Sequence, residues 1–108
     1  MTLQRYRAAQ YQSLEGTLFT LSTLDVQQPA ASFTLRLDAV QDLGERPVEG
    51  GSLPCCALLF SQCDGPGKAY APQGIYRLLH PDLGEQELFV VPMGPARGAP
   101  MCYEVIFN

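Results

Sequence analysis

The sequence predicts a mainly β domain: a small antiparallel β-barrel or sandwich of about six short strands, preceded by one short N-terminal helix. Two observations carry this prediction. Apolar and polar residues alternate with a period of two over several short stretches, which is typical of strands with one buried face. Clusters of glycine and proline separate these stretches, as turns do. Barrel and sandwich differ in strand order, which periodicity does not give, so both architectures stay open.

The chain is expected to fold as a single domain over residues 1–108. Its length of 108 residues suits one hydrophobic core, and no repeat or low-complexity tract interrupts it. A helix is predicted over 6–14, because Tyr6, Tyr11 and Leu14 recur at helical intervals. Gly16 then provides the stop. The aromatic face of this helix is expected to cover one end of the sheet.

Strands are predicted, in chain order, over 17–24, 32–38, 53–63, 74–80, 85–93 and 101–107. The second stretch continues only by skipping a residue, which predicts a bulge near Ala39. The third is apolar on both faces, as a central strand is. Pro81 and Gly84 bound a tight turn, so the fourth and fifth stretches form a hairpin. The segments 44–52, 64–73 and 94–100 are rich in glycine and proline and are expected to be mobile loops.

The last stretch, 101–107, leaves two alternatives. It is either a centrally paired strand or an edge strand that another chain could extend. As an edge it would be a natural assembly contact, including one between copies of this chain.

Composition excludes several classes of partner. The net charge is −4, from seven basic and eleven acidic residues. Such a chain is a poor candidate for binding nucleic acid or an anionic membrane surface, because both attract cationic side chains. No apolar run is long enough to cross a bilayer, and the first residues lack the features of a secretory signal. The expected location is therefore the cytoplasm.

The four cysteines predict neither a metal site nor a disulfide framework. Cys55 and Cys56 are adjacent, so on a strand their side chains point to opposite faces. No pair has the C-x-x-C spacing of a zinc or redox site, and a single histidine cannot complete a zinc finger. We expect buried, reduced thiols, and no cofactor.

His80 is the only histidine and the first candidate for chemistry. It could act as a general base, with Asp82, Glu85 or Glu87 orienting the ring. The alternative is that the ring hydrogen-bonds the turn backbone and caps the end of the sheet. The His-Pro step favours the second interpretation, because proline keeps the preceding residue extended. Glu85 and Glu87 share one face of a strand, and a solvated outer face accounts for them.

No other motif supports catalysis. There is no G-x-S-x-G nucleophile elbow, and the glycine-containing segments 50–52 and 65–68 lack the spacing of a phosphate-binding loop. The cysteines lie in apolar stretches, where the thiolate form is disfavoured. The sequence therefore predicts that the protein is not an enzyme.

A series of short motifs resembles a known family. They are Leu-Leu-Phe at 58–60, Gly-Pro at 65–66, Pro-Gln-Gly-Ile-Tyr at 72–76, His-Pro-Asp-Leu-Gly-Glu at 80–85, Leu-Phe-Val-Val-Pro at 88–92 and Tyr-Glu-Val-Ile-Phe-Asn at 103–108. In this order they resemble a family of small bacterial proteins described only as a domain of unknown function, and Gly-Thr-Leu-Phe at 16–19 is similar to the start of its first strand. Relatives often occur beside phage-tail-collar-like proteins, so the resemblance implies a structural or assembly role. It implies no catalytic residues, and the cysteines depart from the family pattern.

Three functional hypotheses follow. The first is a non-catalytic protein-interaction or structural accessory module, with a protein partner, whose ligand or partner surface includes Tyr76, His80, Asp82, Glu85 and Tyr103. The second is a small-ligand-binding β-barrel with a pocket lined by Tyr76, Phe89 and Tyr103. The third is a hydrolase that uses His80 with the nearby carboxylates.

Overall fold

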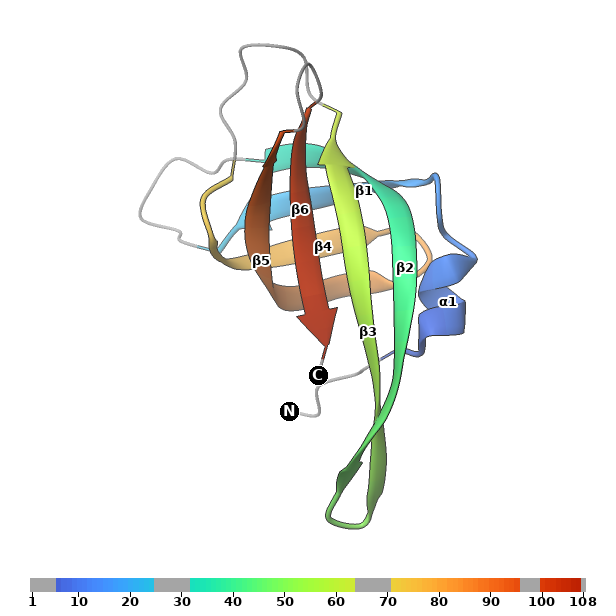
Figure 1. Cartoon of the computed structure of the whole chain (residues 1–108). Coiled ribbons are helices and arrows are strands. Elements are labelled where there is room, and N and C mark those ends of the chain that lie inside the picture. The colour runs from blue at the N-terminus through green and yellow to red at the C-terminus, as the bar shows by residue number, and fades with distance from the viewer. Residues whose placement is uncertain (1–5, 25–31, 64–70, 96–99, 108) are drawn as a thin grey trace.

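A computed structural model describes residues 6–24, 32–63, 71–95 and 100–107. Its elements are α1 (Ala8–Gln12), β1 (Leu18–Thr23), β2 (Ser32–Val48), β3 (Gly51–Gln62), β4 (Gly74–His80), β5 (Gly84–Pro95) and β6 (Met101–Phe107) (Figure 1). The predicted mainly β fold with a short N-terminal helix is confirmed. The helix is shorter than predicted, and β2 is longer.

The six strands form one antiparallel sheet that closes on itself. Their order is β1-β2-β3-β6-β5-β4, and β4 pairs in turn with β1. The sequence prediction left barrel and sandwich as alternatives. The structure has one sheet that closes into a ring, and it is not divided into two facing sheets. The strand β6 therefore lies between β3 and β5, with both of its edges paired. The alternative in which residues 101–107 form an exposed edge is wrong, because the ring closes only if this strand pairs with β3 on one side and β5 on the other.

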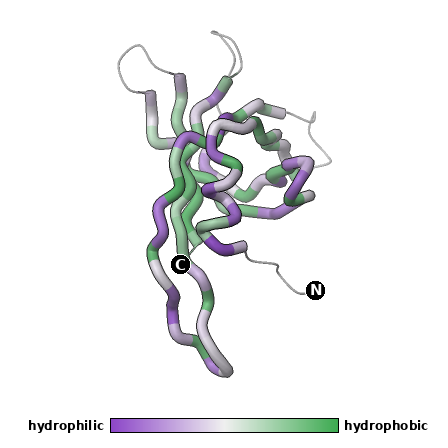
Figure 2. The backbone as a smooth tube through the Cα atoms, turned by 90° about the vertical axis from the view of Figure 1, so that its right-hand side faces the viewer, coloured by the Kyte–Doolittle hydropathy of each residue, from purple (hydrophilic) through white to green (hydrophobic). Residues whose placement is uncertain are grey.

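The alternation of side chains fills the interior of the ring. In β1 the side chains of Phe19 and Leu21 are buried, whereas those of Leu18 and Thr20, which alternate with them, point outward. The same period-two burial recurs at the start of β2 and in β4, whereas β3 is buried at consecutive positions from Cys55 to Leu58. Figure 2 shows the hydrophobic and hydrophilic residues along the backbone. Aromatic rings meet in this core, where Phe19 and Phe60 pack edge to face with centroids 5.2 Å apart.

The helix α1 covers one end of the closed sheet, as its aromatic face predicted. Tyr11 is fully buried, and its ring stacks on Phe107 of β6 with centroids 5.7 Å apart. Its hydroxyl donates a hydrogen bond to Oε1 of Gln86 at 3.0 Å, and the hydroxyl of Tyr6 donates to the Leu83 carbonyl at 3.1 Å. The described helix is five residues long, and no helix among the described residues could cross a bilayer.

Beyond the ring, β2 and β3 continue as a two-stranded hairpin, which we call the arm (residues 43–55) (Figures 1 and 2). Its ladder runs from the pair Gly44–Cys55 to the pair Val48–Gly51. The prediction of a mobile loop over 44–52 is wrong here, because its glycines serve the hairpin. Gly50 adopts a φ of 85° in the two-residue turn, a conformation that other residues rarely take.

Two bulges shift the register between β2 and β3. One lies between Leu37 and Ala39, where the sequence predicted it. The other lies between Asp42 and Gly44, and Oδ1 of Asp42 accepts a hydrogen bond from the Gly44 amide at 2.8 Å. Bulges of this kind bend a strand, and they occur here where the pair of strands leaves the ring.

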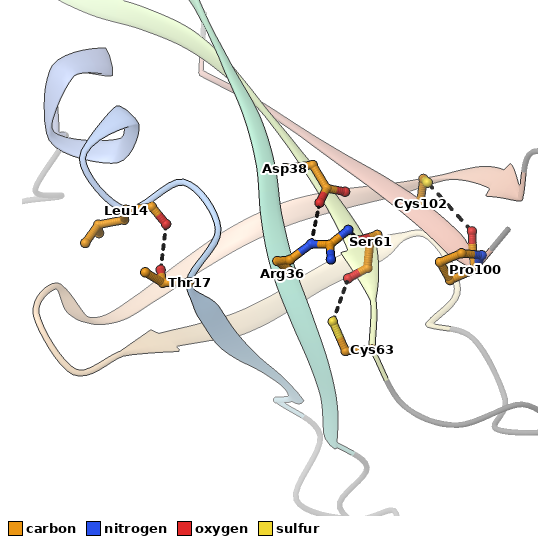
Figure 3. Close-up of polar contacts among 8 residues, drawn as sticks. All are labelled: Leu14, Thr17, Arg36, Asp38, Ser61, Cys63, Pro100 and Cys102. Atoms are coloured by element: carbon orange, nitrogen blue, oxygen red, sulfur yellow. Dashed lines mark hydrogen bonds and ion pairs between the residues drawn. The ribbon is translucent and has the colours of Figure 1, made fainter.

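The four cysteines are free thiols in different surroundings. Cys55 and Cys56 are buried as expected, but Cys63 is exposed and Cys102 half-buried, since both lie on outward positions near strand ends. The Cys63 thiol contacts the Ser61 carbonyl, and the Cys102 thiol contacts the Pro100 carbonyl, each at 3.7 Å (Figure 3). The described residues contain no group of three or more His, Cys, Asp or Glu side chains that could hold a metal ion.

Candidate functional site

His80 lies at the end of β4 and is buried, with 8% of the residue exposed. Its Nδ1 accepts a hydrogen bond from the Asp82 amide at 3.0 Å, so in the neutral ring Nε2 carries the proton. Nε2 lies 3.1 Å from the Thr17 hydroxyl. This hydroxyl donates to the Leu14 carbonyl at 2.6 Å, a bond that Figure 3 shows. The face of the ring packs against Phe19, with centroids 4.5 Å apart.

These contacts are the ones that the capping alternative predicted for His80. Both ring nitrogens are engaged, so no lone pair is directed to a reacting group. Asp82 contributes its backbone amide to the ring, and its side chain is not the orienting carboxylate of a catalytic pair. The ring instead joins the β4–β5 turn to the segment that leads into β1.

Glu85 and Glu87 lie on the outer surface of β5, as predicted. The Glu85 carboxylate is 3.6 Å from Nε of Arg77, and its side chain is 61% exposed. Glu87 lies directly opposite Arg77 in the β4–β5 ladder. Both carboxylates thus border one exposed guanidinium in water, an arrangement that contributes little energy.

The two tyrosines of the predicted surface belong to the core. Tyr103 is fully buried, and its hydroxyl donates to Oε1 of Gln62 at 2.5 Å while it accepts the Ala71 amide at 2.8 Å. The Tyr76 hydroxyl donates to the Pro72 carbonyl at 2.5 Å, and burial raises the pKa of Tyr76 above its ordinary value. Both hydroxyls fix the segment that precedes β4.

The structure does not place Tyr76, Phe89 and Tyr103 around one pocket. Phe89 alternates with the buried residues Leu88 and Val90, so its side chain lies on the outside of the ring, 50% exposed. The five residues predicted as one ligand or partner surface are likewise separated. Tyr76 and Tyr103 are in the core, His80 caps a turn, and Asp82 and Glu85 are exposed.

A different surface combines several exposed apolar side chains on the outside of β3, β4, β5 and β6. We call it the outer apolar face, and it consists of Leu59 (40% exposed), Ile75 (59%), Phe89 (50%), Ile106 (48%) and the half-buried Val91. Single exposed apolar residues are ordinary on proteins, but a contiguous group of them often marks an interaction site.

The strand registers show that these residues are neighbours. Ile75 pairs directly with Phe89 across β4 and β5. Val91 is the next residue of β5 on the same face as Phe89, and it pairs with Glu104 of β6. Glu104 pairs on its other side with Leu59 of β3. Ile106 follows Glu104 on the same face of β6, so the apolar side chains extend across four strands around one carboxylate.

This face was not predicted from the sequence, although the sequence contains a signal for it. The segments 88–91 and 105–107 are apolar at every position. Such runs indicate strands covered on both faces, but the described residues form one short helix, α1, and it lies at one end of the ring. When several strands are apolar on both faces and too few helices are present to cover them, an exposed apolar face is expected.

Comparison with known proteins gives a family without a role. Residues 6–107 match the family described as Domain of unknown function (DUF6916). No curated protein and no solved structure matches the chain significantly.

Proposed function

Since the chain belongs to this family of unknown function, we propose that it is a non-catalytic interaction module whose outer apolar face binds a partner protein. The observation that carries the proposal is that the strand registers make Phe89, Val91, Ile106 and Leu59 neighbours on the outer surface of β5, β6 and β3, with Ile75 of β4 beside Phe89. This surface replaces the partner surface around His80 that the sequence predicted.

Energetics support a partner on this face. Burying a large apolar side chain such as isoleucine or phenylalanine stabilises a complex by roughly 1.5–3 kcal/mol. An aromatic residue amid smaller apolar ones is also the usual composition of the centre of an interface. Phe89, half-exposed and paired with Ile75, occupies such a position.

The surroundings of the candidate catalytic groups support the non-catalytic part of the proposal. The nitrogens of His80 are occupied by the Asp82 amide and the Thr17 hydroxyl. Glu85 is paired with Arg77 in water. Neither group has the combination of a free functional atom and a water-shielded setting that acid–base catalysis needs.

The biological setting is part of the same proposal. The motifs resemble a family of bacterial proteins whose members often occur beside phage-tail-collar-like proteins. This resemblance favours an accessory role in a tail-like or surface assembly, built in the cytoplasm. A module that attaches through one apolar face, with no reaction of its own, suits such a role.

Affinity purification from the native cells tests the proposal. The tagged wild type is compared with an Ile75→Ser/Phe89→Ser variant and with Leu18→Ser as the matched control. Leu18 is 55% exposed at the start of β1, whereas the end of β1 that lies beside Ile75 is Thr23, which pairs with Tyr76. We expect mass spectrometry to find a partner with the wild type and with Leu18→Ser that is lost with the double variant. Equal recovery by all three folded proteins would contradict the proposal.

A further inference from the structure

Glu104 is an acidic residue within an otherwise apolar surface. It lies on β6 directly between Leu59 of β3 and Val91 of β5, and its side chain is half-buried. The ion pairs among the described residues join Arg7 to Glu45, Arg36 to Asp38 and Arg77 to Glu85, and so do not include Glu104. The two neighbouring strands place an apolar side chain on each side of it.

Covering this face would remove water from the carboxylate. A carboxylate that is buried without a counter-charge costs several kcal/mol, which would offset much of the gain from the surrounding apolar contacts. A partner that places a cation against Glu104 avoids this cost and obtains a charge-assisted hydrogen bond in a water-poor setting. The charge at the centre of the face therefore selects among apolar partners.

We propose, on the basis of the function proposed above, that Glu104 determines the specificity of the outer apolar face, which binds a protein surface of apolar side chains around one lysine or arginine. A partner with an uncharged or acidic residue at that point is rejected, because it leaves the carboxylate unpaired or repels it. Glu104 thus favours partners with a basic residue at this point and disfavours partners without one.

Charge argues against a second copy of this chain as the occupant. A symmetric dimer through one face would bring the two Glu104 side chains towards each other around its twofold axis. Glu87, on the same strand and the same face as Phe89, adds a further acid at the border. The chain carries a net charge of −4, and an anionic lipid surface is disfavoured on the same grounds. The observations thus favour a different, locally basic protein.

The test uses the partner recovered with the tagged wild type and measures how much of it each variant retains at roughly 0.05 M and roughly 0.5 M NaCl. The variants are Glu104→Gln, which keeps the shape and removes the charge, and Glu104→Lys, which reverses it. Glu87→Gln is the matched control at the border. We expect Glu104→Gln to retain at least about tenfold less partner than the wild type, and to show much less dependence on salt. Glu104→Lys is expected to retain no partner. Glu87→Gln is expected to retain as much as the wild type.

The outcomes separate this inference from the proposed function. If Glu104→Gln binds as the wild type does while Ile75→Ser/Phe89→Ser does not, the face is a docking site, but the inference that the partner places a lysine or arginine against Glu104 is wrong. If the double variant still binds, the docking site itself is wrong. A wild type that recovers no more than the double variant contradicts both. Sedimentation equilibrium is expected to show a monomer, and a dimer that Phe89→Ser dissociates would identify a second copy as the occupant.

Discussion

His80 connects two segments that are far apart in the chain. Through Nδ1 it holds the β4–β5 turn at Asp82, and through Nε2 it reaches Thr17 and so the end of the α1 region. Its ring also covers Phe19 at this end of the core. Histidine suits this position because its flat ring packs against Phe19 while its two nitrogens bond in different directions, and no acid–base role is needed to explain it.

Replacing His80 therefore affects stability. We expect His80→Ala to lower the free energy of unfolding by about 1–3 kcal/mol, through the lost hydrogen bonds and the gap beside Phe19. His80→Asn, which keeps an acceptor for the Asp82 amide, is expected to lose less. Asp82→Asn should stay within about 0.5 kcal/mol of the wild type, because only its backbone takes part. Urea denaturation measures all three, and a larger loss for Asp82→Asn than for His80→Ala would contradict this account.

The Tyr76 hydroxyl predicts a pH dependence on the alkaline side. Burial raises the pKa of Tyr76 above its usual value of 10.0, so the folded protein holds this proton more tightly than the unfolded chain does. The corresponding stability is fully present below pH 10 and is lost as the pH rises towards the folded-state pKa. Between these values the free energy of unfolding is expected to fall more steeply for the wild type than for Tyr76→Phe. Parallel curves from chemical denaturation across this range would contradict the assignment.

At the residue scale, local patterns predicted local contacts. The His-Pro step indicated that His80 would bond its own turn, and the Nδ1 contact with Asp82 confirms it. The bond from Tyr103 to Gln62 and that from the Ala71 amide to Tyr103 were not predictable, because these residues are far apart in the sequence. The orientation of Phe89 was missed because its neighbours on the strand are apolar as well.

At the scale of the elements, the arm is the part that sequence reasoning described least well. Glycine and proline are signals of loops, but they also occur at bulges, in tight hairpins and in strands whose outer edge is unpaired. Gly44, Pro47, Gly50 and Pro54 all lie in such positions on β2, β3 and the turn between them. Proline, which lacks an amide hydrogen, also limits further strand pairing along these exposed edges.

The arm is expected to be dispensable for folding. No residue of the arm belongs to the main hydrophobic cluster, and the ion pair between Arg7 and Glu45 joins two exposed side chains. Replacing residues 45–54 by Asn-Gly would close the hairpin at the Gly44–Cys55 pair. We expect this variant to stay within about 1 kcal/mol of the wild type in urea denaturation. A loss of cooperative unfolding would show that the arm contributes to the core.

At the scale of the whole molecule, the closed ring explains both the stability of the fold and its exposed surface. Closure pairs every strand of the ring on both sides and buries the inward side chains. The period-two pattern was sufficient to predict the strands, but strand order and closure depend on long-range pairing that periodicity does not encode. A sheet closed around a single core has no second layer over its outer surface. The apolar positions of β3, β4, β5 and β6 that point outward therefore remain exposed.

The central claim is that this outer apolar face binds a protein, and site-specific photocrosslinking in the native cells tests it most directly. The benzoyl-phenylalanine crosslinker is placed at Phe89 on the face, at Val48 on the arm, or at Leu18 on β1, all of which are exposed. The account predicts a discrete crosslinked protein from position 89, weakened by Glu104→Lys, and none from position 18. The same crosslinked protein from position 48 or 18, with none from position 89, would contradict it.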